Sequence, residues 1–252
     1  MSFDVAAEAY DAFMGRYSRR LAGPFADLAG VKAGQHVLDV GCGPGALTGE
    51  LVERVGADRV AAVDPSEPFV EAARARHPGV DVRMASAEDL PFDDDTFDVT
   101  VAQLVVHFMR DPVRGLREMG RVTRTGGTVA ACVWDHAGGL GPLGAFWSAA
   151  GELDPQVTDE SHLPGARLGH LQALAAEAGL TDIAATTLIA DLELHTFEAW
   201  WEPFERGVGP AGAYVSNRTS DQREALRDVL RQRLGPGPFT IPARAWAIRG
   251  TA

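Results

Sequence analysis

Three glycines at alternate positions constrain this chain more than any other feature of its sequence. Gly41, Gly43 and Gly45 follow directly on the short apolar run 37–40, and residues 46–55 have the composition of a helix. Glycine is needed where a backbone turns tightly or lies close against a ligand. A glycine-rich turn between a buried strand and a helix N-terminus is typical of a cofactor-binding unit in an α/β fold.

The residues around this turn extend the pattern along the chain. The strands are continuous apolar runs rather than alternating ones, which is the pattern of a parallel sheet covered by helices on both faces. In the first half, further strands are predicted at 60–64, 80–84, 97–102 and 128–134, with helices at 4–29, 66–76 and 113–122. In the less regular second half, helices are predicted at 167–178, 197–204 and 220–234, and strands at 183–194 and 239–248.

The stretch from Leu38 to Gly45, L-D-V-G-C-G-P-G, resembles motif I of the class I S-adenosylmethionine-dependent methyltransferases. Its glycines have the spacing G-x-G-x-G, whereas nicotinamide-binding folds have G-x-G-x-x-G. The turn at 117–127 resembles the segment before strand five of the same family, with Thr125 in place of the usual proline. The resemblance covers roughly the first 135 residues and points to the broad group that includes ubiquinone and menaquinone methyltransferases.

This resemblance implies a Rossmann-like, mostly parallel sheet of seven strands in the order 3-2-1-4-5-7-6, with strand seven antiparallel and helices on both faces. Ligands then bind at the carboxyl ends of the strands, where strands one and four diverge. Two segments are longer than a connection between elements requires. The predicted organisation is an N-terminal helical lid at 1–30, a cofactor-binding core at 31–136, 166–194 and 238–252, and a helical cap formed by the insertions 137–165 and 195–237.

The resemblance also implies S-adenosylmethionine as the methyl donor and S-adenosylhomocysteine as the product. Asp64 ends a predicted strand about 20 residues after the last glycine, where a carboxylate can accept hydrogen bonds from a ribose diol. Asp39 either attracts the ammonium group of the donor or orients the glycine loop. The other predicted contacts near the loop come from Gly41, Cys42, Gly43, Gly45 and Pro65.

Three more segments complete the predicted donor site. The segment S-A-E-D-L-P-F resembles the family segment that reads the adenine edge, although Ser86 stands where many relatives have Asp. Ala87 then supplies a backbone N–H and Glu88 an acceptor. Gln103, at the end of the fourth predicted strand, is the predicted contact of the methionine moiety. Arg16 either pairs with the methionine carboxylate or belongs to a helical stripe that packs on the core.

Methyl transfer from a sulfonium asks a protein mainly to position the acceptor, because the methyl group is already activated. His107, Tyr17 and His136 are the candidates for a general base, and the alternative for His107 is a packed helix residue. The acceptor is predicted to be a small, apolar or aromatic molecule held by Trp134, Trp147 and Trp201, unless these rings form the core of the cap. Transfer to oxygen, to nitrogen and to carbon all remain open at this stage.

The amino-acid composition limits which binding partners and which cellular compartment we expect for this protein. A formal net charge of −12 disfavours nucleic acid and anionic membranes as partners. No apolar run is long enough to cross a bilayer. The two cysteines, Cys42 and Cys132, are predicted to be free thiols of a cytoplasmic protein. The histidines and cysteines lack metal-ligand spacing, so no metal site is predicted, and the oligomeric state is left open.

Two other classes of function compete with a methyltransferase. A nucleotide-dependent oxidoreductase needs the G-x-G-x-x-G spacing that this chain lacks, and the S-A-E-D-L-P-F segment has no role in it. A cofactor-binding module that has lost catalysis is favoured by the departures at Ser86 and Thr125. The intact glycine loop and Asp64 argue against such a loss.

Overall fold

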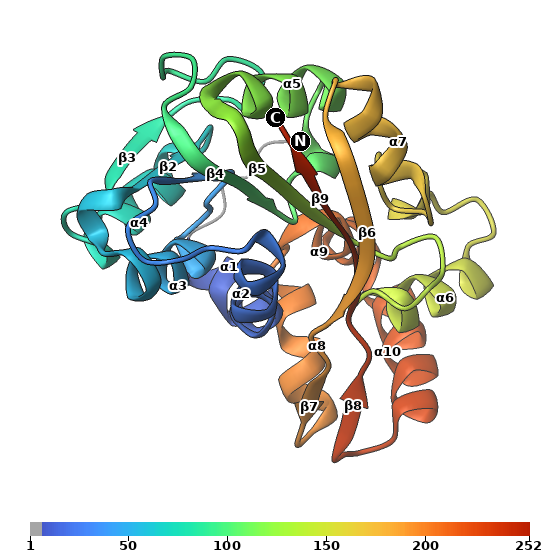
Figure 1. The fold of residues 1–252 in the computed structure, drawn as a ribbon. Helices are drawn as coiled ribbons and strands as arrows, with labels where there is room; N and C mark the ends of the chain where they lie inside the picture. Colours follow the sequence, from blue (N-terminus) through green and yellow to red (C-terminus); the bar gives the residue numbers. More distant parts are fainter. Residues whose placement is uncertain (1–6) are drawn as a thin grey trace.

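The computed structural model describes residues 7–252 and is built on a seven-stranded sheet (Figure 1). The strand order is β3-β2-β1-β4-β5-β9-β6, which confirms the predicted order. β9 takes the place of the predicted strand seven, between β5 and β6. Neighbours from β3 to β5 are parallel, and β9 is antiparallel to both β5 and β6. The strands of this sheet are β1 Val37–Val40, β2 Val60–Asp64, β3 Asp81–Met84, β4 Phe97–Gln103, β5 Thr123–Trp134, β6 Thr181–Ile189 and β9 Arg244–Thr251.

Helices cover both faces of the sheet, as the apolar strands predict. Helix α2 packs against α3, β4 and β5 on one face, whereas α5 and α7 cover the other face. The α-helices are α1 Ala7–Phe13, α2 Gly15–Ala29, α3 Ala46–Val55, α4 Glu67–Arg76, α5 Pro112–Val122, α6 Gly144–Leu153, α7 His170–Glu177, α8 Phe197–Glu205, α9 Gly209–Ser216 and α10 Ser220–Leu234. Short 3₁₀ helices lie at η1 Ala57–Arg59, η2 Val106–Phe108 and η3 Glu160–His162.

The N-terminal helix is interrupted at Met14, so the prediction of one helix over 4–29 is wrong at this point; residues 4–6 lie outside the described part of the chain. Tyr17, Leu21 and Phe25 are spaced four residues apart and are fully buried on α2. A Cβ at position 15 would lie 2.6 Å from Asp11 Oδ1. Gly15 therefore allows a close contact between α1 and α2 that a larger residue would prevent.

Two predicted strands each divide into two. The predicted strand 183–194 splits into β6 and β7 (Leu192–Leu194), and the predicted strand 239–248 splits into β8 (Phe239–Ile241) and β9. Pro242 stands between β8 and β9, and proline has no N–H to continue a ladder of strand hydrogen bonds. β7 and β8 pair with each other as a separate antiparallel sheet, which extends away from the main sheet beside α8 and α10 (Figure 1).

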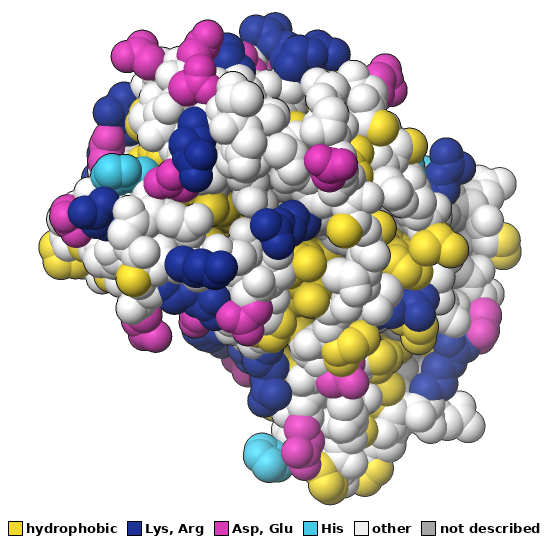
Figure 2. Space-filling view, in the orientation of Figure 1, with side chains coloured by type: hydrophobic (Ala, Val, Ile, Leu, Met, Phe, Trp, Pro, Cys, Tyr) yellow, Lys and Arg dark blue, Asp and Glu magenta, His cyan; other side chains and the backbone are white. Residues whose placement is uncertain are grey.

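One of the two edges of the main sheet lies at β6. Figure 2 shows hydrophobic side chains exposed around the part of β6 that approaches the β7–β8 sheet, and Ile189 at the end of β6 is 54% exposed. β5 and β9 separate β6 from β4 in the sheet. This edge is therefore remote from the carboxyl ends of β1, β2 and β4, where the predicted ligand site lies.

Residues 7–252 contain neither a helix suited to cross a membrane nor a cluster of possible metal ligands. None of the helices in this range is long and apolar enough to cross a membrane. No group of three or more His, Cys, Asp and Glu side chains in the same range is arranged to hold a metal ion.

Candidate functional site

The glycine loop between β1 and α3 adopts a backbone that only glycine adopts easily. The φ angles of Gly41, Gly43 and Gly45 are 71°, 54° and 93°, all in the left-handed region. A Cβ at Gly41 would overlap the Val105 side chain. A Cβ at Gly43 would meet no atom within 4 Å, so this position faces open space. The loop thus presents bare backbone to a cavity.

Polar side chains beneath the loop hold this conformation. Asp39 Oδ2 accepts a hydrogen bond from the Thr48 hydroxyl at 2.7 Å, and Asp39 does not line the cavity. Arg76 donates to the Pro44 carbonyl at 3.0 Å, and the His77 ring lies 2.9 Å from the Gly45 carbonyl. Burial raises the pKa of Asp39 to about 7, against the Thr48 hydrogen bond that lowers it. This placement favours the interpretation in which Asp39 orients the loop.

A cavity of about 610 Å³, called here the large cavity, lies at the carboxyl ends of β1, β2 and β4. The structure brings together in its wall most of the residues predicted for the donor site. They are Gly41, Gly43, Asp64, Pro65, Ala87, Glu88 and Gln103, together with Ser86. Four distant stretches of sequence therefore meet at the edge of the sheet where parallel strands were expected to place a ligand.

Asp64 is the buried carboxylate in this wall. Its Oδ2 accepts a hydrogen bond from the Gly43 N–H at 2.8 Å, and its Oδ1 accepts one from the Ser66 N–H at 2.9 Å. Burial raises the pKa of Asp64, while these two N–H groups act in the opposite direction. Each carboxylate oxygen has a second lone pair, so Asp64 can also accept from a ligand.

Gln103 lines the large cavity and has a buried acceptor without a partner among the described residues. Its Nε2 donates to the Ser18 carbonyl at 3.1 Å, which fixes the orientation of the amide. Its Oε1 is buried and has no hydrogen-bond partner among the described residues. Because an unsatisfied buried acceptor costs about 1–3 kcal/mol, a ligand N–H at this position would relieve the cost.

Glu88 holds the far side of the cavity in place. Its carboxylate accepts hydrogen bonds from the backbone N–H of Arg110 at 2.7 Å and of Asp111 at 3.3 Å. Burial raises the pKa of Glu88, but the surrounding backbone N–H groups outweigh burial and leave the pKa below its ordinary value. The side chain therefore connects the segment after β3 to the segment before α5.

Besides Asp39, three residues predicted for the donor site do not line the large cavity. Cys42 points into a small core with Ala62 and Val70, so only its backbone belongs to the loop. Arg16 donates to the Ala199 carbonyl at 3.2 Å and therefore reaches toward α8. Gly45 lies against His77.

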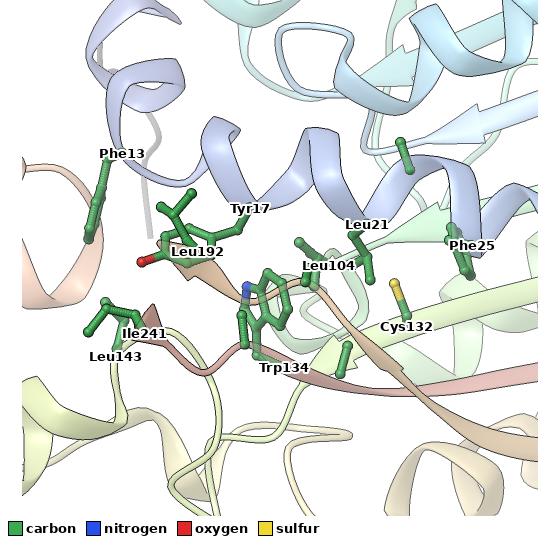
Figure 3. Packing of buried hydrophobic residues seen from close by; sticks show 14 of the residues in the cluster. Phe13, Tyr17, Leu21, Phe25, Leu104, Cys132, Trp134, Leu143, Leu192 and Ile241 are labelled. Atoms are coloured by element: carbon green, nitrogen blue, oxygen red, sulfur yellow. The ribbon is translucent and has the colours of Figure 1, made fainter. Parts of the chain in front are cut away.

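Tyr17 is also displaced from its predicted role. Its ring packs edge-on against Trp134, with 6.3 Å between the ring centroids (Figure 3). It lines neither cavity, and burial raises its pKa. The tyrosine that does line the large cavity is Tyr10, on α1, whose ring lies 5.2 Å from that of Phe69. The sequence contained no signal to choose Tyr10 over Tyr17, because both lie on one helical stripe.

A second, smaller cavity, called here the side chamber, adjoins the large cavity. Its free volume is about 40 Å³, and it shares Tyr10, Leu104 and Phe108 with the large cavity. Trp134, a predicted acceptor contact, lines it, and so does His107. His136, another candidate base, lines it too, and the structure adds Glu160, which the sequence analysis left out.

The other two predicted tryptophans lie on α6 and α8 rather than in a cavity wall. Trp147 donates its indole N–H to Glu160 Oε2 at 2.8 Å. Trp201 stacks on Phe197, with 6.2 Å between the ring centroids. Neither tryptophan lines the large cavity or the side chamber. The alternative in which these rings form the core of the cap therefore fits their placement better.

Comparisons with known proteins agree with this geometry. The methyltransferase domain family matches residues 38–131. The chain is 40% identical over 114 residues to the chloroplastic 2-methyl-6-phytyl-1,4-hydroquinone methyltransferase 2 of Oryza sativa, covering 44% of this chain and 30% of that protein. It is 39% identical over 110 residues to the ubiquinone/menaquinone biosynthesis C-methyltransferase of Idiomarina loihiensis, covering 41% and 44%. The chain thus spans less than half the length of these curated relatives.

The fold is also shared with solved methyltransferase structures. One is a Thermotoga maritima protein described as a SAM-dependent methyltransferase and a possible histamine N-methyltransferase. It matches 97% of this chain and 98% of its own, with 20% identity and a TM-score of 0.55. The strand order, the glycine loop and the matched family agree: residues 38–131 of this chain are similar to the methyltransferase domain family.

Proposed function

We propose that this protein transfers a methyl group from S-adenosylmethionine to a small, largely apolar molecule. The observation that carries the proposal is the open space above Gly43 in an acid-rich cavity. Four carboxylates line the large cavity, Asp64, Glu88, Asp89 and Asp111, against two guanidinium groups, Arg110 and Arg114. This balance suits a donor that carries a sulfonium and an ammonium group.

The residues of the large cavity would divide the donor among them. Asp64 would accept hydrogen bonds from the ribose hydroxyls, and Gln103 Oε1 would accept one from the ammonium group. The Ala87 N–H and the Ser86 hydroxyl would meet the adenine edge. When bound, the donor supplies an activated methyl group, and the protein supplies the positioning.

The acceptor is proposed to be a neutral or weakly polar molecule, and two observations support this. Trp134 lines the side chamber, which gives a site next to the large cavity an aromatic wall. Two relatives that match the methyltransferase domain are named for a hydroquinone and for quinone biosynthesis. Residues 1–30 would then act as a lid, and 137–165 and 195–237 as a cap over the acceptor.

We also propose that the enzyme is located in the cytoplasm. Cys42 and Cys132 are both buried, free thiols, as expected for a chain kept in a reducing compartment.

A nicotinamide cofactor suits the large cavity poorly. Folds that bind it have glycines with the spacing G-x-G-x-x-G, whereas Gly41, Gly43 and Gly45 have the spacing G-x-G-x-G. Nor does Gln103 Oε1, an acceptor without a partner among residues 7–252, fit the anionic pyrophosphate of that cofactor.

Isothermal titration calorimetry separates these alternatives. The protein should bind S-adenosylhomocysteine and should show no binding heat with NAD at the same concentration. Tight NAD binding, or no binding of S-adenosylhomocysteine, would refute the proposed donor. Formation of S-adenosylhomocysteine from S-adenosylmethionine with a panel of phenols and hydroquinones would then distinguish an active enzyme from a module without catalysis.

A further inference from the structure

The side chamber has one polar wall, and apart from Tyr10 its other surroundings are largely apolar. His107, His136 and Glu160 form the polar wall, while apolar side chains such as Phe13 and Leu143 face it. Its free volume of about 40 Å³ has room for about three water molecules. Apolar cavities that take benzene measure about 150 Å³, so the chamber admits a small polar group rather than a ring.

The two histidines of this wall have unused hydrogen-bonding atoms. His107 is 4% exposed, and its Nδ1 has no hydrogen-bond partner among the described residues. The same holds for Nε2 of His136, and the two rings lie 5.7 Å apart between centroids. Each unsatisfied buried atom costs about 1–3 kcal/mol, so two beside one small chamber indicate a place for a polar ligand group.

Both imidazoles are neutral near pH 7. Burial lowers the pKa of His107 well below its ordinary range, with a smaller contribution from His136, and burial lowers the pKa of His136 to about 4. A neutral imidazole has one N–H donor and one acceptor nitrogen. A hydroxyl group also donates once and accepts, so it matches this pair of rings.

The third polar residue argues against an anionic ligand. Glu160 is 5% exposed, and one of its oxygens is already bound to the Trp147 indole N–H. Within the described residues, neither Lys nor Arg lines the side chamber. A carboxylate or phosphate would therefore be buried beside Glu160 without a cationic partner, which is unfavourable.

We propose that the side chamber binds a hydroxyl group of the methyl acceptor between His107 and His136, and that the acceptor is uncharged. The apolar body of the molecule would remain in the large cavity, across the shared residues Leu104 and Phe108. The inference rests on the proposed function only in naming the molecule an acceptor. It assigns to the chain a selectivity for phenol-type molecules over acids and over hydrocarbons of the same shape.

Three small probes test this selectivity by calorimetry on the full chain, with and without S-adenosylhomocysteine. Phenol carries the hydroxyl, toluene has a similar shape without it, and benzoate carries a charge. Phenol should bind about tenfold more tightly than toluene, as expected for one net hydrogen bond, and benzoate should show no binding. Equal affinity for phenol and toluene, or binding of benzoate, would overturn the inference. This test needs only the wild-type protein.

Variants then assign the effect to the histidines. His136→Phe and His107→Phe should each weaken phenol binding about five- to tenfold and leave toluene binding unchanged. His195→Phe, at an exposed histidine outside both cavities, is the matched control and should leave both affinities unchanged. Folded variants of His107 and His136 that keep the preference for phenol would contradict the assignment.

The failure of the inference differs from the failure of the proposed function. If wild-type protein binds S-adenosylhomocysteine but does not distinguish phenol from toluene, the inference fails and the proposed donor stands. If it distinguishes the probes but does not bind S-adenosylhomocysteine, the side chamber is a hydroxyl site and the proposed donor is wrong.

Discussion

Two aspartates near the glycine loop illustrate how placement decides a role. Asp39 and Asp64 lie at the carboxyl ends of neighbouring strands, and burial raises the pKa of both. Asp39 is turned toward Thr48 beneath the loop, whereas Asp64 lines the large cavity. The same type of residue thus supports the loop in one case and faces the ligand site in the other.

Asp64→Ala should weaken binding of S-adenosylhomocysteine by about 1.5–3 kcal/mol, because charge-assisted hydrogen bonds to the ribose would be lost. Titration calorimetry measures the affinity, and circular dichroism checks that the variant is folded. Asp58→Ala, at an exposed aspartate that does not line the large cavity, is the control. A folded Asp64→Ala variant with unchanged affinity would show that the carboxylate does not bind the ribose.

Glu160 should make stability depend on pH in a defined direction. Burial raises its pKa from 4.5 to about 7. Between these values the unfolded chain loses the proton while the folded protein keeps it, so the contribution of Glu160 to the free energy of unfolding falls as pH rises. Glu160→Gln has no ionisable group at this position and can still accept the hydrogen bond from Trp147. Its free energy of unfolding should therefore not fall with pH for this reason.

The two proteins should therefore be similarly stable near pH 4, and Glu160→Gln should be more stable at pH 7 by at most about 3 kcal/mol. Urea unfolding at several pH values measures the difference. His136 titrates in the same range with the opposite sign, because burial lowers its pKa to about 4, but it is present in both proteins and cancels. A constant difference between pH 4 and pH 7 would contradict the raised pKa.

At the scale of elements, the glycine loop combines a left-handed backbone, which would strain any other residue, with an open surface. Gly43 and Gly126 both have positive φ angles, 54° and 77°, and a Cβ at either would meet no atom within 4 Å. Only Gly43 lines the large cavity. The two positions therefore make a matched pair for separating strain from loss of binding.

Gly43→Ala and Gly126→Ala should each lose roughly 1–2 kcal/mol of stability, because alanine is strained in the left-handed region. Only Gly43→Ala should also lose affinity for S-adenosylhomocysteine, by tenfold or more, since its methyl group would occupy the donor's approach to the loop. Thermal unfolding and calorimetry measure the two effects. Equal affinity in both variants would show that the loop is a structural turn only.

At the scale of the whole molecule, the two cavities come from different parts of the chain. The residues that line the large cavity lie between Tyr10 and Arg114 in the sequence. The side chamber also needs Trp134, His136, Glu160 and residues 208–211. Figure 3 shows how closely Trp134 lies beneath Tyr17 of α2 and beside Leu104. The donor and the acceptor should therefore respond separately to substitutions.

Trp134→Phe is the conservative test of this separation, because replacing a fully buried tryptophan by alanine would cost about 3–5 kcal/mol. The Phe variant should bind phenol or the acceptor several-fold more weakly and should keep its affinity for S-adenosylhomocysteine. Phe25→Leu, a contraction of a similarly buried ring outside both cavities, controls for general loss of packing. If both affinities fall together, or neither changes, Trp134 belongs to the scaffold.

Local features of the sequence determined the glycine loop, the buried parallel strands and the position of Asp64, whereas the order of the sheet was implied by the family resemblance. These depend on backbone demands that neighbouring residues meet: glycines at positive φ, apolar runs in buried parallel strands, and a carboxylate at a strand end. The break at Met14 and the separate β7–β8 sheet were not predictable from apolar periodicity, because the hydrophobic pattern continues through both interruptions.

Only the tertiary structure decided which polar side chains meet. Tyr10 rather than Tyr17 faces the large cavity, and Arg16 reaches Ala199, far along the chain. His107 and Glu160 come to one chamber although 52 residues separate them, and no local pattern marks Glu160. Local residue types specify strands and turns, but contacts between distant side chains follow from how those elements pack.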